Sequence, residues 1–153
     1  MMKRILLALW TVAGLCMLGG CGEPYVLRGK AISGGYGSLL FVGPDDEQLR
    51  EPGLAAASIS IYRDANRPNQ SLFATGRSDG LGEISIPLKG FGVGWMEEQW
   101  LIEVTKPGYE TLQSVVTLPP AKHDRRILIT LIPGLSVPPK QAEDLWQEYE
   151  RYR

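Results

Sequence analysis

Hydrophobic and polar residues alternate along several short segments between Tyr25 and Pro133. A period of two is typical of β-strands, because successive side chains point to opposite faces of a sheet. Glycine, proline and aspartate residues, which favour turns, separate the segments. The pattern predicts seven strands at Tyr25–Ser33, Ala57–Tyr62, Ser71–Arg77, Glu83–Leu88, Trp100–Thr105, Tyr109–Leu118 and Arg125–Ile132.

The alternation also predicts which side chains face the interior. We expect these to be Ala57, Ile59 and Ile61, then Ile84, Ile86 and Leu88, and then Trp100, Ile102 and Val104. Gly34–Gly53 forms an insertion after the first strand, and its Ser38–Val42 portion is a candidate for a short additional strand. The pattern therefore favours a single all-β domain built as an antiparallel sandwich.

Two motifs make this fold prediction more specific. Thr75–Ile86 places Asp-Gly before an alternating strand, and Val104–Tyr109 places a lysine before Gly-Tyr between two strands. In this order and spacing, over about Leu27 to Ile132, the chain resembles carboxypeptidase regulatory-like domains. The resemblance implies a seven-stranded prealbumin-like Greek-key β-sandwich over residues 25–135.

The turn residues of these motifs have a mechanical explanation. Asp79 and Gly80 suit the left-handed positions of a tight hairpin turn, and Gly108 can adopt a left-handed conformation as well. Tyr109 is large enough to cap one end of the core. A metal-ligand or acid role for Asp79 is the less favoured alternative.

The N-terminal segment has the parts of a secretory signal. Lys3 and Arg4 precede the uncharged apolar run Ile5–Leu18, which is shorter than the roughly 20 residues that span a membrane. Leu18-Gly19-Gly20-Cys21 then resembles the lipobox of bacterial lipoproteins. An ordinary signal peptide with a chance cysteine and an N-terminal membrane helix are the alternatives.

The lipobox resemblance implies how the chain is processed. Residues 1–20 would be the signal peptide, and Cys21 would carry a diacylglyceryl group on its thiol and an acyl chain such as palmitate on its amine. Residues 21–24 would be a lipidated tether, so membrane lipid is the expected partner and the domain is extracytoplasmic. Gly22 is not aspartate, which implies the outer membrane if the host is Gram-negative.

The remaining composition argues against catalysis. Cys16 would leave with the signal peptide, so the mature chain has no free thiol. His123 is the only histidine, and it stands in a polar connection without the converging ligands or nucleophile that a zinc site or a catalytic triad needs. We expect no enzyme activity, cofactor or metal. The formal net charge is −1 and no basic cluster stands out, so nucleic acid is not an expected partner.

Three aromatic side chains are candidate contact residues. Phe91 and Trp95 lie in the glycine-rich connection Gly90–Met96, and Trp100 follows it. Flat rings suit a membrane interface or the apolar face of a sugar. Packing over an open end of the sandwich is the alternative, and exposed coplanar rings would favour the sugar.

The C-terminal residues 136–153 predict a short helix. Leu145, Tyr149 and Tyr152 recur at helical spacing beside Trp146, and this apolar stripe either docks on the domain or binds a partner such as an envelope protein. Docking is favoured because the strand Arg125–Ile132 is apolar on both faces and one face lacks an obvious cover.

The expected protein is a non-catalytic, membrane-anchored binding or structural module of the cell envelope. A carbohydrate-binding module that uses the loop aromatics is the alternative. If successive strands alternate in direction, the connections Gly90–Met96 and Pro119–Asp124 lie at the pole of Cys21. The insertion and the turns at residues 78–80 and 106–108 then lie at the opposite pole.

Overall fold

The structure is a computed structural model that describes residues 24–65 and 70–135. The predicted signal peptide at residues 1–20, the lipidated Cys21 and the predicted C-terminal helix at residues 136–153 lie outside the described residues. The same holds for the candidate partner-contact residues of that helix, Leu145, Trp146, Tyr149 and Tyr152.

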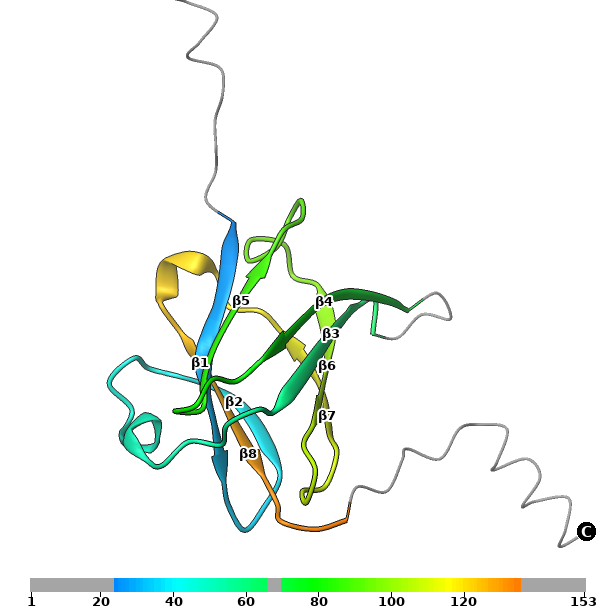
Figure 1. Cartoon of the computed structure of the whole chain (residues 1–153). Helices are drawn as coiled ribbons and strands as arrows, with labels where there is room; N and C mark the ends of the chain where they lie inside the picture. The colour runs from blue at the N-terminus through cyan, green and yellow to red at the C-terminus, as the bar shows by residue number, and fades with distance from the viewer. Residues whose placement is uncertain (1–23, 66–69, 136–153) are drawn as a thin grey trace, which may run out of the picture.

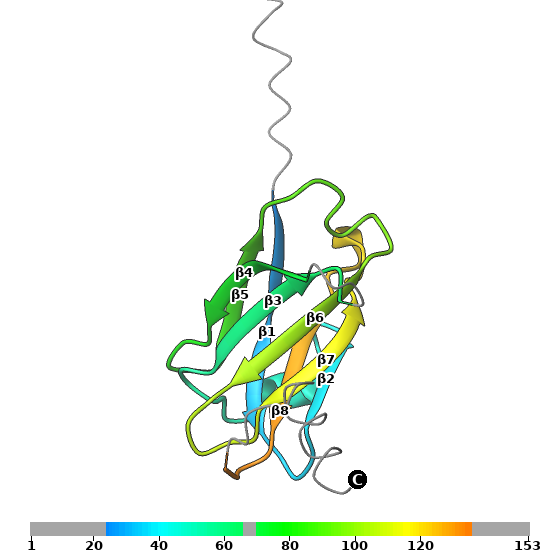
Figure 2. The ribbon, with the colours of Figure 1, turned by 90° about the vertical axis from the view of Figure 1, so that its right-hand side faces the viewer.

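Two four-stranded sheets pack face to face as a β-sandwich (Figures 1 and 2). The first has the order β2-β8-β1-β5 and the second has the order β4-β3-β6-β7. The strands are β1 (Tyr25–Ser33), β2 (Ser38–Val42), β3 (Ser58–Arg63), β4 (Ser71–Arg77), β5 (Glu83–Leu88), β6 (Gln99–Thr105), β7 (Leu112–Thr117) and β8 (Arg126–Leu131). Two short 3-10 turns accompany them, η2 (Glu47–Arg50) and η3 (Ala121–His123). The all-β prediction is confirmed.

The described residues form eight strands rather than the seven expected. The additional strand is β2, the segment proposed as a candidate within the insertion, and it pairs with β8 so that Leu40 lies opposite Leu128. Strand neighbours are antiparallel except β1 and β8, which run parallel. The last strand, β8, thus returns to the first sheet, lies beside β1 and runs in the same direction.

The core lies between the sheets, on the faces that the alternation predicted. In β5, for example, Ile84, Ile86 and Leu88 are buried while the residues between them are exposed. The predicted inward residues of the other strands, Ala57, Ile59, Ile61, Trp100, Ile102 and Val104, belong to the same hydrophobic cluster. Tyr109 is partly buried and packs against this cluster, as expected.

The Asp79 turn connects the two sheets and is not the hairpin that the sequence suggested. β4 and β5 lie in different sheets, so their strands are not hydrogen-bonded neighbours. Asp79 Oδ1 accepts hydrogen bonds from the backbone N–H groups of Leu81 (2.9 Å) and Glu83 (2.8 Å). The left-handed residue is Gly82 (φ +80°) rather than Gly80. A Cβ on Gly82 would also lie 2.5 Å from the Gly53 Cα, so the backbone conformation and the close approach both require glycine at this position. The β6–β7 hairpin, in contrast, has Gly108 left-handed (φ +81°) as predicted.

The insertion lies over part of the outer face of the first sheet. Leu128 and Ile32 are buried although they lie outside the main core cluster. The insertion crosses beside them, where Gly53 bridges Ile32 and the Lys30 ammonium donates to the Leu49 carbonyl oxygen (2.9 Å). The insertion therefore lies beside the outer face of β8, for which the sequence offered no obvious cover, while the predicted docking of the tail concerns residues outside the described ranges.

The poles of the sandwich follow the predicted strand parity. Tyr25 pairs with Leu88, so the β5–β6 loop lies beside the start of β1. The Tyr25 hydroxyl donates to the Pro119 carbonyl oxygen (3.1 Å), which places the β7–β8 connection at the same end. The turns after β1, β4 and β6 lie at the opposite end (Figure 2). Only the insertion departs from the prediction, because β2 runs back along β8 until Val42 pairs with Arg126.

Candidate functional site

The β5–β6 loop presents the two candidate aromatic residues. Two left-handed glycines, Gly92 (φ +86°) and Gly94 (φ +80°), shape the loop, and Met96 N donates to Gly92 O (2.9 Å). Val93, between them, is buried in the core cluster and holds the loop against the sandwich. Gly94 lies so close to Tyr25 that an added Cβ would be 2.3 Å from the ring, so this glycine permits the close approach.

Phe91 and Trp95 project from this loop into solvent. Their exposed fractions are 78% and 68%, and Met96 beside them is 43% exposed. The two ring centroids lie 5.4 Å apart with an angle of 80° between the ring planes. The pair is therefore an edge-to-face wedge at the pole where β1 begins, and not a flat platform.

Trp100 is not a contact residue, contrary to the prediction. It is only 1% exposed, and its ring packs edge to face on Phe73 at 4.9 Å. The reason is strand alternation, since Trp100 shares the inward face of β6 with Ile102 and Val104. The alternation along β6 therefore predicts the position of Trp100 correctly, whereas its nearness in sequence to Phe91 and Trp95 does not.

An ion pair braces the base of the loop. Arg63 on β3 pairs with Glu98 at 2.5 Å and also donates to the Phe91 carbonyl oxygen (3.4 Å). The guanidinium lies over the rings of Phe73 (5.9 Å) and Trp100 (5.6 Å). These contacts bind the loop at both ends to the second sheet. The sequence contained no signal for Arg63, because its partners come from three other segments of the chain.

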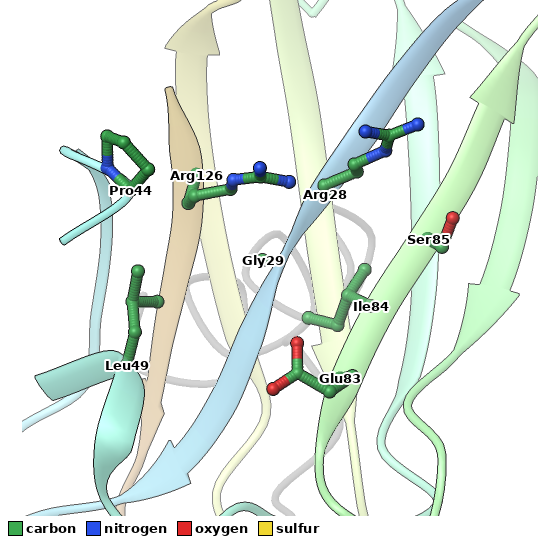
Figure 3. A pocket seen from close by; sticks show the side chains of 8 residues that line it. All are labelled: Arg28, Gly29, Pro44, Leu49, Glu83, Ile84, Ser85 and Arg126. Atoms are coloured by element: carbon green, nitrogen blue, oxygen red, sulfur yellow. The ribbon is translucent and has the colours of Figure 1, made fainter. Parts of the chain in front are cut away.

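A groove crosses the outer face of the first sheet, between η2 and β5 (Figure 3). Arg28 on β1, Arg126 on β8 and Ser85 on β5 line it. Sequence reasoning missed this group and found no basic cluster, because the two arginines are far apart along the chain. The parallel pairing of β1 with β8 brings them together.

Two further polar residues, Asp46 and His123, lie apart from the loop and the groove. Asp46 caps η2 by accepting from Gln48 N (3.0 Å), and His123 is exposed in η3. Within residues 24–65 and 70–135, no three His, Cys, Asp or Glu side chains gather where they would hold a metal ion. In the same ranges, no helix has the length and apolarity needed to span a membrane.

No protein-family model matches the chain, and no curated protein matches it either.

Proposed function

We propose that the chain is a membrane-anchored lipoprotein whose non-catalytic β-sandwich acts as a binding or structural module at the membrane surface. In this proposal the sandwich is of the prealbumin-like Greek-key type, and the helix at residues 136–153 serves contacts with another envelope component. The observation that carries the proposal is the exposed Phe91–Trp95 wedge at the pole where β1 begins.

The wedge and the proposed anchor belong to the same end of the domain. Tyr25 follows Cys21 by four positions in the sequence, and an extended chain covers at most about 3.6 Å per residue, or about 14 Å in all. Tyr25 pairs with Leu88, which directly precedes the aromatic loop. An acyl anchor on Cys21 would thus hold Phe91 and Trp95 against the headgroups, where aromatic rings are favoured.

Sugar stacking, the alternative, lacks the geometry it needs. The coplanar rings that would favour a flat sugar platform are absent, because the planes of Phe91 and Trp95 cross at 80°. The third ring, Trp100, is buried. Membrane contact is therefore the better supported use of the loop, because insertion into an interface does not require coplanar rings.

The anchor is tested by labelling cells with radioactive palmitate. The parent chain should incorporate the label and sediment with membranes, whereas Cys21→Ser should do neither. Cys16→Ser is the matched control and should behave as the parent. Label retained in Cys21→Ser would contradict the lipoprotein proposal.

The contact is tested by reconstituting the full acylated chain into vesicles that contain brominated phospholipid, which quenches tryptophan only at short range. Trp95 should contribute most of the quenched emission, so Trp95→Phe should abolish most of the quenching. Trp146→Phe is the matched control and should leave it unchanged. Equal quenching in the parent and in Trp95→Phe would show that the wedge faces away from lipid.

A further inference from the structure

Three polar side chains form a row across the outer face of the first sheet. On one side, Arg28 pairs with Ser85 of β5. On the other side, Gly29 pairs with Ile127 of β8, so the residues that precede this pair, Arg28 and Arg126, lie beside each other. Neighbouring strands are about 4.8 Å apart, so the row spans three strands within reach of one small ligand. Leu27 and Ile127 point into the core, so the arginines beside them point outward.

The charges of this row are not balanced. Arginines side by side on neighbouring strands repel each other. Arg126 has an ion pair with Asp124 at 3.2 Å, and Lys30 lies 3.7 Å from Glu83. Arg28 makes no ion pair or hydrogen bond within the described part of the chain. Among the described residues, one positive charge in the groove is therefore left without a partner.

The groove has walls on both sides of this charge. On one side η2 is held over the sheet by the hydrogen bond from Lys30 to Leu49 O, and on the other side β5 contributes Ser85 and Glu83 (Figure 3). In the same view the Arg126 side chain extends from β8 toward β1, beside Arg28. The Asp124 carboxylate is 65% exposed, and an exposed ion pair is weak, so Arg126 can exchange this partner for a ligand.

We propose that Arg28 and Arg126 bind a phosphate group in this groove. The planar guanidinium fork matches phosphate oxygens, and the Ser85 hydroxyl can donate a third hydrogen bond. Glu83 also lines the groove, and Lys30, 3.7 Å away, offsets part of the repulsion that its carboxylate exerts on a phosphate.

The phosphate can belong to a lipid headgroup or be free in solution. Arg28 is three residues from Tyr25, or about 10 Å along the strand from the proposed membrane pole. A headgroup is the source that fits this position. That choice of source rests on the proposed function, whereas the site itself rests only on the geometry of the groove.

The test uses the full chain purified in a non-ionic detergent at low ionic strength. Calorimetric titrations with inorganic phosphate, dihexanoyl phosphatidylglycerol and dihexanoyl phosphatidylcholine are compared. Phosphate and phosphatidylglycerol should bind saturably, and Arg28→Gln and Arg126→Gln should each raise Kd about tenfold. Arg28→Lys should weaken binding less than Arg28→Gln. Arg77→Gln, an exposed arginine on the other sheet, is the matched control and should change Kd less than about twofold.

Each outcome has a distinct meaning. Saturable binding of inorganic phosphate without saturable binding of either lipid supports the site and overturns the headgroup as its source. Absence of saturable phosphate binding, or equal losses in Arg28→Gln and Arg77→Gln, overturns the site even if Cys21 is acylated. Phosphate binding that depends on Arg28 supports the site even if Cys21 proves not to be acylated.

Discussion

The Tyr25 hydroxyl donates a hydrogen bond of 3.1 Å to the Pro119 carbonyl oxygen. This bond ties the first residue of β1 to the connection that leads into β8, so the two parallel neighbours are held together at the pole of the aromatic wedge. Burial of the phenol also raises the pKa of Tyr25 above its ordinary value of 10.0.

The raised pKa predicts a loss of stability in alkali. The pKa of Tyr25 is higher in the folded than in the unfolded chain, so its stabilising contribution is complete below about pH 10 and disappears as pH rises through the folded pKa. Tyr25→Phe should lower the free energy of unfolding by about 1 kcal/mol at pH 7 and reduce its decline above pH 10. Urea unfolding between pH 7 and 11 measures this, with Tyr36→Phe as the exposed control. Identical pH profiles for Tyr25→Phe and the parent would refute it.

Asp79 should stabilise the connection between the sheets. Asp79→Ala removes the acceptor of two backbone hydrogen bonds, and we expect a loss of about 1–2 kcal/mol in the free energy of unfolding. Asp45→Ala, at an exposed position of the insertion, should change it by less than about 0.5 kcal/mol. Equal urea midpoints for the two variants would mean that the Asp79 contacts contribute nothing.

The two tryptophans near the aromatic loop should differ sharply in their effect on stability. Trp100→Ala empties a fully buried site and should cost about 3–5 kcal/mol, whereas Trp95→Ala should cost less than about 0.5 kcal/mol. Thermal unfolding followed by circular dichroism distinguishes them. A larger effect of Trp95→Ala would show that the loop aromatic packs into the domain.

Lys30 should hold the insertion against the sheet. Lys30→Met retains most of the buried stem but removes the donor to Leu49 O, so η2 should open more often. A loss of about 1 kcal/mol corresponds to about fivefold faster trypsin cleavage after Arg50. Lys122→Met, an exposed lysine in η3, should leave the rate at Arg50 unchanged. An unchanged cleavage rate in Lys30→Met would show that the hydrogen bond from Lys30 to Leu49 O does not hold η2 against the sheet.

The strands and their inward faces can be predicted from the alternation of hydrophobic and polar residues alone. Ile84, Ile86 and Leu88 are buried as the alternation predicted, because the direction of a strand side chain is a local property of the extended backbone. Gly108 is left-handed for a similar local reason, since a hairpin turn needs a residue that tolerates positive φ. The alternation also predicted that Trp100 points inward, and it does. The separate prediction that its ring contacts a ligand conflicted with this pattern and was wrong.

Which strands become neighbours follows from long-range packing and not from the local pattern. The local pattern of Arg28 and Arg126 shows that each lies on a strand, but not that β1 and β8 pair in parallel. Nor does the pattern around Asp79 distinguish a hairpin from a connection between two sheets. Strand pairing depends on the burial and hydrogen bonding of segments far apart in the chain, so the groove and its unbalanced charge exist only once the whole sandwich has formed.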